Sequence, residues 1–247
     1  HYIKNGWIKL MLRKSLNKNS FFYKPYLFYN LFVQNRCYIK RETYSQFQED
    51  IFINSYFKEF NEGTYVDIGC FHPIMHSNTA KLYNKGWKGI NIDLNPISID
   101  LFNILRKRDK NYCAAISNSN KKVKSYIDDY FSPINSINKK FFNYTFNEFS
   151  KGDFIEQEID SYKLQDFFLK EGLKIDKIDF LNVDVEANDL KVLEGIDFNN
   201  LNIKLICVEM FNEDGNIDQN TFTGLLKDYN YKLIKVIGPN GFFEKDK

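Results

Sequence analysis

The chain has 247 residues, of which 43% are hydrophobic and 27% charged, so it has enough apolar side chains to bury a large core and is not a disordered chain. No apolar run approaches the roughly 18 residues that a membrane span requires. The net charge of +2 is unevenly distributed, because residues 1–41 carry nine Lys or Arg and no acidic residue. The remainder, with 25 basic and 32 acidic residues, has a mildly acidic balance that is typical of a protein without a nucleic-acid partner.

Residues 1–42 form a basic, aromatic N-terminal arm that precedes a domain of residues 43–247. Apolar residues recur at helical spacing over 7–16, and the segment 21–33 is dense in aromatic residues and interrupted by Pro25. Two interpretations remain open. The arm is either an anchor on a membrane surface, or a helical segment that packs on its own domain or on a second subunit.

From residue 43 the chain alternates short apolar runs with helical stretches, which is typical of a parallel sheet with crossover helices. Ser45 is expected to cap a first helix with Gln48 at its third position, and Gly63 follows that helix. The expected strands are 65–68, 89–92, 112–116, 178–183 and 204–208. The expected helices are 78–85, 97–107, 163–170, 188–193 and 219–229. A β-hairpin over 231–244 is expected to end the chain, and the polar segment 118–154 is expected to lie over the sheet edge as an elaborated substrate region.

The four cysteines, Cys37, Cys70, Cys113 and Cys207, are too far apart in sequence for a zinc knuckle or a CxxC pair. We expect free thiols in a reducing compartment, buried at the last three positions, which lie in or beside apolar runs. The N-terminus shows no signal-peptide pattern, and the expected location is therefore the cytoplasm.

Acidic residues mark the ends of the first two expected strands. The first strand runs into Asp67-Ile68-Gly69, where a glycine lets a ligand approach the backbone closely. The glycine pattern of a dinucleotide site, GxGxxG, is absent. Asp93 closes the second strand, where an acid can accept hydrogen bonds from both ribose hydroxyls of a nucleoside. The alternative is a loop acid that caps the helix after Pro96, but the pairing with Asp67 favours nucleoside binding.

Six segments occur in an order and spacing that resemble the FkbM-type S-adenosylmethionine-dependent methyltransferases. They are SQFQED (45–50), YVDIGCFHP (65–73), HSNTAKLYNKGWKGINIDLNP (76–96), AAIS (114–117), IDFLNVDVEANDLKVLEGIDF (178–198) and ICVE (206–209). The chain departs from the family at Ala187, where Gly is usual, and at Cys70, where Ala is frequent. The arm and residues 118–154 lie outside the resemblance.

The resemblance implies a class I methyltransferase fold, which is a Rossmann-like, seven-stranded, mostly parallel sheet with helices on both faces and an antiparallel last strand. It also implies S-adenosylmethionine as cofactor. Its methionine part would lie on Asp67, Gly69 and the following backbone, its ribose on Asp93, and its adenine against Ala115 and Ile116. The further residues expected to contact the cofactor are Gln46, Cys70, Phe71, His76, Ser77, Asn78, Thr79 and Leu94.

Three further carboxylates follow the fourth and fifth strands. Asp184 and Glu186 alternate after Asn182, so they point the same way if the strand continues, and Glu209 ends the neighbouring strand. Such groups can hold a substrate hydroxyl, act as a general base or cap a helix. Asp184 and Glu209 are also candidate ligands for a divalent cation, Mg²⁺ or Mn²⁺. His72 is the fourth catalytic candidate, because an imidazole titrates near neutrality.

The expected activity is O-methylation of a sugar or sugar nucleotide in surface polysaccharide biosynthesis, as for many members that resemble this chain. The alternatives are a lipid, polyketide or amine acceptor, or a non-catalytic interaction protein that retains the fold. Retention of both Asp67 and Asp93 disfavours the non-catalytic alternative. The expected partner is a small molecule rather than a nucleic acid, and the arm is the candidate surface for membrane contact or homo-oligomer formation.

Overall fold

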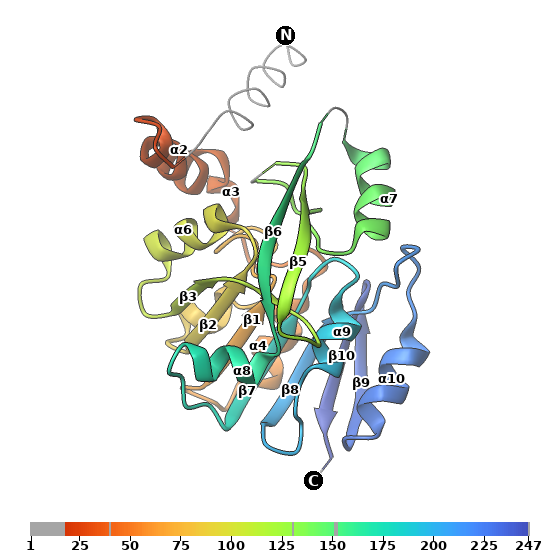
Figure 1. Ribbon diagram of the computed structural model, residues 1–247. Helices are drawn as coiled ribbons and strands as arrows, with labels where there is room; N and C mark the ends of the chain where they lie inside the picture. The colour runs from red at the N-terminus through yellow and green to blue at the C-terminus, as the bar shows by residue number, and fades with distance from the viewer. Residues whose placement is uncertain (1–17, 40, 130, 151–152, 247) are drawn as a thin grey trace.

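The computed structural model describes residues 18–39, 41–129, 131–150 and 153–246. Its centre is a seven-stranded sheet in the order β3-β2-β1-β7-β8-β10-β9, in which β10 is antiparallel to both of its neighbours (Figure 1). This is the class I methyltransferase fold that the resemblance implied. The strands are β1 Thr64–Ile68, β2 Lys88–Asp93, β3 Lys110–Cys113, β7 Lys177–Val183, β8 Asn202–Glu209, β9 Tyr231–Ile237 and β10 Asn240–Lys245.

Helices cover both faces of this sheet. Alternate residues of each strand point to opposite sides, so both faces carry apolar side chains that a layer of helices can bury. Val66 belongs to a cluster that includes Phe167 and Phe222, whereas its neighbour Tyr65 packs in a second cluster with Phe57 on the other face. The helices around the sheet are α4 Glu49–Tyr56, α5 Ala80–Asn84, α6 Pro96–Leu105, α8 Leu164–Lys170, α9 Asp189–Glu194 and α10 Gln219–Lys227. The expected helices are therefore confirmed, with shifted ends.

The chain reverses its direction of travel across the sheet at β1. This strand pairs in parallel with β2 on one side and with β7 on the other, and β7 pairs with β8. In open α/β sheets, such a switch point leaves a crevice beyond the carboxyl ends of the strands, where ligands bind. The loops that follow these strands therefore form the candidate site.

A second, three-stranded sheet was not predicted. The expected strand 112–116 divides into β3 of the central sheet and β4 Ala115–Ile116, which pairs with β6 Ile155–Tyr162. β5 Lys121–Ile127 completes this sheet, and α7 Lys139–Phe149 packs on β5 through aromatic side chains. β5 (KKVKSYI) carries lysines on both faces. On β6 (IEQEIDSY) the three acids share one face and the opposite face has only two isoleucines among Gln and Ser, so neither segment has the continuous apolar face that predicts a strand.

The predicted cap of the first helix is wrong. α4 begins at Glu49, and Gln48 has a left-handed backbone (φ 72°) rather than a helical one. The Ser45 hydroxyl instead donates to the Asp50 carboxylate at 2.9 Å, and that carboxylate also accepts the backbone N–H of Tyr44 at 2.8 Å. The segment before the helix therefore folds back onto the helix instead of continuing into it.

The described part of the arm packs on its own domain, which was one of the two alternatives. It contains α2 Tyr23–Tyr29, the π-helical turn η1 Asn30–Gln34 and α3 Arg36–Ile39. One side of α2 and η1 is buried against α6 and Phe131. The helix expected over residues 7–16 lies outside the described residues. No helix in the described part of the chain has the length and apolar character needed to cross a bilayer.

All four thiols are free. Cys70 and Cys207 are buried as expected, but the prediction for Cys113 is wrong because its side chain is exposed. Cys113 ends β3, the strand at the edge of the central sheet, where one flank has no neighbouring strand to cover it.

Candidate functional site

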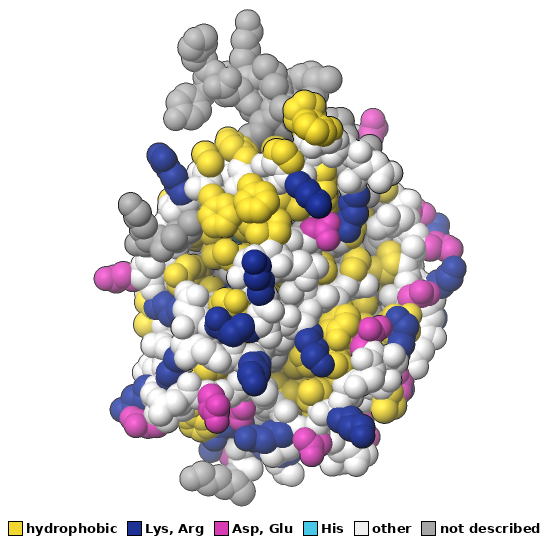
Figure 2. Space-filling view, turned by 90° about the vertical axis from the view of Figure 1, so that its left-hand side faces the viewer, with side chains coloured by type: hydrophobic (Ala, Val, Ile, Leu, Met, Phe, Trp, Pro, Cys, Tyr) yellow, Lys and Arg dark blue, Asp and Glu magenta, His cyan; other side chains and the backbone are white. Residues whose placement is uncertain are grey.

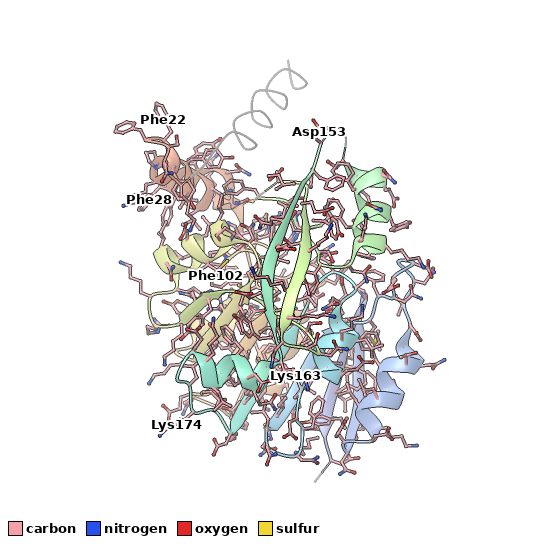
Figure 3. The ribbon with its side chains drawn as sticks, in the orientation of Figure 1. Phe22, Phe28, Phe102, Asp153, Lys163 and Lys174 are labelled. Carbon is pink, nitrogen blue, oxygen red and sulfur yellow. The ribbon has the colours of Figure 1, made fainter. Side chains whose placement is uncertain are left out.

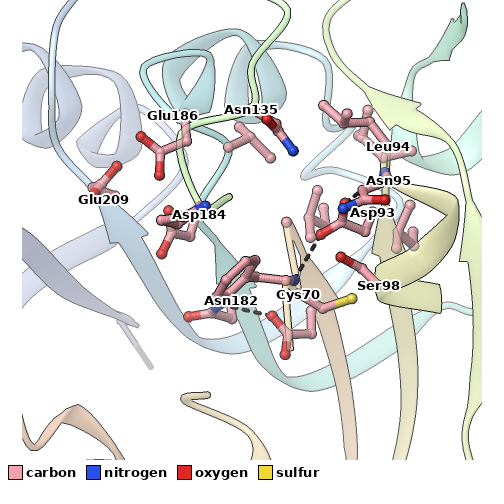
Figure 4. Close-up of a pocket in the computed structure, with 18 of the residues that line it drawn as sticks. Cys70, Asp93, Leu94, Asn95, Ser98, Asn135, Asn182, Asp184, Glu186 and Glu209 are labelled. Atoms are coloured by element: carbon pink, nitrogen blue, oxygen red, sulfur yellow. Dashed lines mark hydrogen bonds between the residues drawn. The ribbon is translucent and has the colours of Figure 1, made fainter. Parts of the chain in front are cut away.

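A pocket lies across the carboxyl ends of β1, β2, β7 and β8. Figure 4 shows two groups of polar side chains that face each other across it. Asp93 and Asn95 lie on one side, at the end of β2 and the start of α6, and Asp184, Glu186 and Glu209 lie on the other, beyond β7 and β8. The pocket thus occupies the switch point of the sheet.

The glycine after β1 allows two loops to meet. Gly69 has a φ of +79°, and a Cβ atom at this position would lie 1.7 Å from the backbone oxygen of Asp184. Its N–H donates to the Ile92 oxygen at 2.8 Å, so the same residue also binds the loop to β2. A side chain here would push the β1 and β7 loops apart and change the floor of the pocket.

Asp93 is fixed by backbone donors from both sides. Its Oδ2 accepts the N–H of Phe71 and its Oδ1 accepts the N–H of Asn95, both at 2.7 Å. Burial raises the pKa of this carboxyl to about 6. Each oxygen of a carboxylate can accept a further hydrogen bond, so Asp93 still offers two acceptors to a ligand in the pocket.

Asp67 is a structural anchor as well as a pocket residue. It is buried, and its carboxylate accepts hydrogen bonds from Thr79 Oγ1 at 2.6 Å and from Asn182 Nδ2 at 2.9 Å. Burial also raises the pKa of Asp67. Thr79, which was expected to contact the cofactor, is absent from the described lining of the pocket and lies behind Asp67. That expectation is corrected, because the Thr79 hydroxyl is occupied within the protein.

Arg106 supports this anchor and was missed from the sequence. Its guanidinium is buried and donates to Thr79 Oγ1, Ser77 Oγ and the Pro73 oxygen, each at 2.7 Å. It therefore fixes the loop that connects β1 to α5. In the sequence it stands beside Lys107 and Arg108 at a helix end, a context that is typical of solvated basic residues.

His72 has no free ring nitrogen. Nε2 lies 2.9 Å from Asn30 Oδ1, and Nδ1 accepts the backbone N–H groups of Ile74 and Met75 at 3.2 and 3.0 Å. Burial lowers its pKa to about 3, and it is absent from the described lining of the pocket. This geometry contradicts the expected catalytic position, because the neutral imidazole holds the loop and the arm together.

The other end of the pocket is polar and partly open. His76, Gln46, Ser77 and Asn78 line it. His76 is exposed, and its Nε2 lies 3.1 Å from the Tyr38 hydroxyl of the arm. The arm therefore reaches the edge of the pocket.

Asp184, Glu186 and Glu209 line the same pocket. The expectation that the strand continues through Asp184 and Glu186 is wrong. β7 ends at Val183, and a turn with positive φ at Glu186 (55°) and Ala187 (61°) brings both acids to the pocket. Burial raises the pKa of Asp184 to about 7 and that of Glu186 well above its usual range, and the neighbouring carboxylates add to both shifts. The same causes raise the pKa of Glu209, whose Oε2 is buried without a hydrogen-bond partner.

The unpredicted second sheet and its loops form the roof of the pocket. Ala115 and Ile116 of β4 supply an apolar wall, and Asn135 lies above the acids (Figure 4). The Ser136 hydroxyl donates to the backbone oxygen of Glu186 at 2.9 Å, which joins this segment to the β7 loop. Other lining residues that were not predicted from the sequence are Ile68, Ile92, Asn95, Ser98, Ala114, Ser132, Pro133, Ile137, Asn182, Val185 and Asn188.

The described lining of the pocket is acidic. It contains five carboxylates and no Lys or Arg side chain. The carboxylates are Asp67, Asp93, Asp184, Glu186 and Glu209. Within the described part of the chain, no group of three or more His, Cys, Asp or Glu residues has the arrangement of a metal site.

The family described as "Methyltransferase FkbM domain" matches residues 63–233, which is more than half of the chain. No curated protein matches the sequence.

Several solved structures have similar folds at low sequence identity. A TehB-like S-adenosylmethionine-dependent methyltransferase from Corynebacterium glutamicum is 11% identical, with a TM-score of 0.45, over 86% of this chain and 94% of that chain. A Burkholderia thailandensis 1,6-didemethyltoxoflavin-N1-methyltransferase is 10% identical, with a TM-score of 0.42, over 94% and 93%. An O-methyltransferase from Bacillus cereus is 11% identical, with a TM-score of 0.43, over 96% and 95%.

The contact at Gly69 gives a prediction about stability. Gly69→Ala should lower the free energy of unfolding by about 3 kcal/mol or more, because the added methyl meets the Asp184 backbone and the left-handed φ disfavours Ala. The control is Gly172→Ala, at φ +66° with nothing within 4 Å of the added Cβ, which should cost about 1 kcal/mol. Urea unfolding measures both, and equal losses would contradict the proposed contact.

Asp184 gives a prediction about pH. Folding raises the pKa of its carboxyl from an ordinary 3.8 to about 7, so the ionised group destabilises the fold fully above pH 7. This penalty disappears as the pH falls towards 3.8. Asp184→Asn should therefore raise the free energy of unfolding at pH 8 by up to about 4 kcal/mol, with little gain at about pH 4. Urea unfolding at both pH values tests this, and a gain that is independent of pH would contradict it.

Proposed function

This chain belongs to the FkbM family of S-adenosylmethionine-dependent methyltransferases, and we propose that its acceptor is a hydroxyl group of a sugar. The observation that carries this proposal is the group of Asp184, Glu186 and Glu209, which faces Asp93 across one pocket. Carboxylates are suited to a polyhydroxylated acceptor, because each can accept hydrogen bonds from two or more hydroxyl groups. Biosynthesis of a surface polysaccharide is the proposed setting.

The pocket residues fit the cofactor in chemistry and order. We propose that Asp93 binds the ribose through its two remaining acceptors, and that Ala115 and Ile116 contact the adenine. Asp67 and the backbone at Gly69 would border the methionine part, with Gln46, His76, Ser77 and Asn78 around its amino-acid end. The remaining contacts are proposed for Cys70, Phe71 and Leu94, which also line the pocket.

We assign the proton transfer to Asp184. The bound cofactor supplies a methyl group activated by its sulfonium, and the acceptor oxygen must lose its proton as it reacts. A carboxyl with a pKa of about 7 is well matched to that task near neutral pH. Burial is the main cause of this raised pKa, and the carboxylates of Asp67, Glu49 and Asp93 add to it. Glu186 and Glu209 would orient the other hydroxyl groups of the sugar.

The sign of the charge favours a neutral sugar over a sugar nucleotide inside the pocket. A diphosphate carries negative charge, and protein sites for phosphate use Lys, Arg or helix N-termini as partners. The described lining offers five carboxylates and no basic side chain. A nucleotide part would therefore have to lie outside the pocket, and an amine acceptor is the alternative that the charge also permits.

A divalent cation is the alternative to a general base. Asp184 and Glu209 would be its ligands, and it would lower the pKa of the acceptor hydroxyl instead of removing the proton directly. The unpartnered Oε2 of Glu209 is consistent with either role.

The cofactor assignment predicts the effect of removing Asp93. Asp93→Ala should weaken the binding of S-adenosylhomocysteine by about 30- to 1000-fold, the loss expected for two charge-assisted hydrogen bonds. Calorimetry measures the affinity, with Asp228→Ala, an exposed carboxylate, as the matched control. Unchanged affinity in Asp93→Ala would rule out the ribose role.

The acceptor assignment is tested by mass spectrometry of products. The protein and S-adenosylmethionine should add one methyl group to a neutral oligosaccharide in a panel that also contains nucleotide sugars and amines. Asp184→Asn should lower the rate by about 100-fold or more while S-adenosylhomocysteine still binds. A chelator that lowers the parental rate equally would assign the role to a cation. Parental turnover in Asp184→Asn would refute both versions.

A further inference from the structure

The arm exposes an unusual number of large apolar side chains. Six of them lie outward between residues 21 and 33, and we call this set the aromatic face. Its members are Phe21, Phe22, Phe28, Tyr29, Phe32 and Val33. Phe21, Phe22 and Phe28 are 88%, 68% and 52% exposed. Figure 3 shows Phe22 and Phe28 pointing away from the rest of the fold.

The aromatic face stays outward because the opposite side of the same helix is fixed. Tyr23, Leu27 and Leu31 are buried against Ile97 and Leu101 of α6. These inward residues recur every four positions, and the outward residues occupy the positions between them, so the helix cannot bury both sides against its own domain. Contiguous exposed apolar surface of this kind marks an interaction site.

The charge of the arm indicates which kind of partner the aromatic face binds. All nine charged residues within 1–41 are basic, whereas the rest of the chain has a balance of −7. Lys24 and Arg36 lie within or beside the aromatic face, and Figure 2 shows Lys and Arg side chains beside the apolar ones on this side of the molecule. A partner that fits must therefore accept aromatic side chains and carry negative charge.

We propose that the aromatic face binds an anionic lipid membrane as a peripheral contact. Aromatic side chains enter the boundary between headgroups and acyl chains, and Lys and Arg beside them are attracted to anionic lipid. A second copy of this chain fits less well, because pairing two aromatic faces would bring two basic arms together.

The contact would also orient the pocket. Asn30 and Asn35, on the arm, contact His72 in the loop after β1, at 2.9 and 3.3 Å. The Tyr38 hydroxyl lies 3.1 Å from His76, which lines the pocket. A membrane bound at the aromatic face would therefore lie on the side of the arm away from this loop, with the acceptor pocket held close to the lipid surface. The proposal does not depend on which acceptor is methylated.

Co-sedimentation of the full chain with lipid vesicles tests this proposal. The parent should bind vesicles that contain phosphatidylglycerol, and bind phosphatidylcholine vesicles more weakly. Replacing Phe21, Phe22 and Phe28 together by Ser should weaken the binding by about 10-fold or more, since each buried aromatic contributes to partitioning. Raising the ionic strength to about 1 M should weaken binding to the anionic vesicles only.

The matched control replaces Phe149, Leu169 and Ile217 by Ser. These side chains are 71%, 76% and 52% exposed and lie outside the arm, so this variant should bind like the parent. A further variant, Lys24→Gln with Arg36→Gln, removes the exposed basic side chains within or beside the aromatic face and should weaken the preference for anionic lipid. Equal affinity for S-adenosylhomocysteine in every variant would show that the fold is intact.

Three outcomes would overturn the proposal. The parent could fail to bind either vesicle, or the control variant could lose binding as strongly as the arm variant. Light scattering could also show a dimeric parent and a monomeric arm variant, in which case the aromatic face would join two copies of the chain.

Discussion

The buried carboxylate of Asp67 is the interaction on which the site depends. It lies at the end of β1, where the sheet changes direction, and accepts hydrogen bonds from Asn182 of β7 and from Thr79 before α5. Arg106 reaches the same hydroxyl from the end of α6. One carboxylate thus joins segments that are distant in sequence, and it does so only because the glycine at position 69 lets the β1 and β7 loops touch.

The ionised carboxylates of the pocket are unfavourable in the folded protein, and a ligand of opposite charge would make them less so. Asp93, Asp184, Glu186 and Glu209 all have raised pKa values, because burial and mutual repulsion penalise their ionised forms. Functional sites commonly keep such strained ionisable groups at the expense of stability. A cationic sulfonium beside these acids, as proposed above, would relieve the repulsion, so binding of the cofactor and ionisation of the pocket would favour each other.

Backbone strain is concentrated in the same place. Among the described residues, Phe71, His76 and Glu186 line the pocket with positive φ, and Ala187 follows with a φ of 61°. The family usually has Gly at the last of these positions, which suits a left-handed backbone. Here Ala adopts it at a cost of about 1–2 kcal/mol, and the Asn138 amide holds the turn by donating to the Ala187 oxygen at 3.1 Å. The departure from the family therefore keeps the shape of the turn.

The order of the elements in the central sheet, and the acidic residues at the ends of its strands, follow from the sequence by itself. Apolar runs with Gly and Asp at their ends are local patterns, so the order of strands and helices, and the positions of Asp67 and Asp93, could be read directly. Only the tertiary structure decided the second sheet. Lys121–Ile127 has lysines on both faces, Ile155–Tyr162 has only two isoleucines on the face opposite its acids, and the two strands depend on each other for pairing. It also decided the roles of His72 and Arg106. The hydrogen-bond partners of both side chains come from distant segments. They make His72 a buried support rather than a catalyst, and Arg106 a buried support rather than a solvated surface residue.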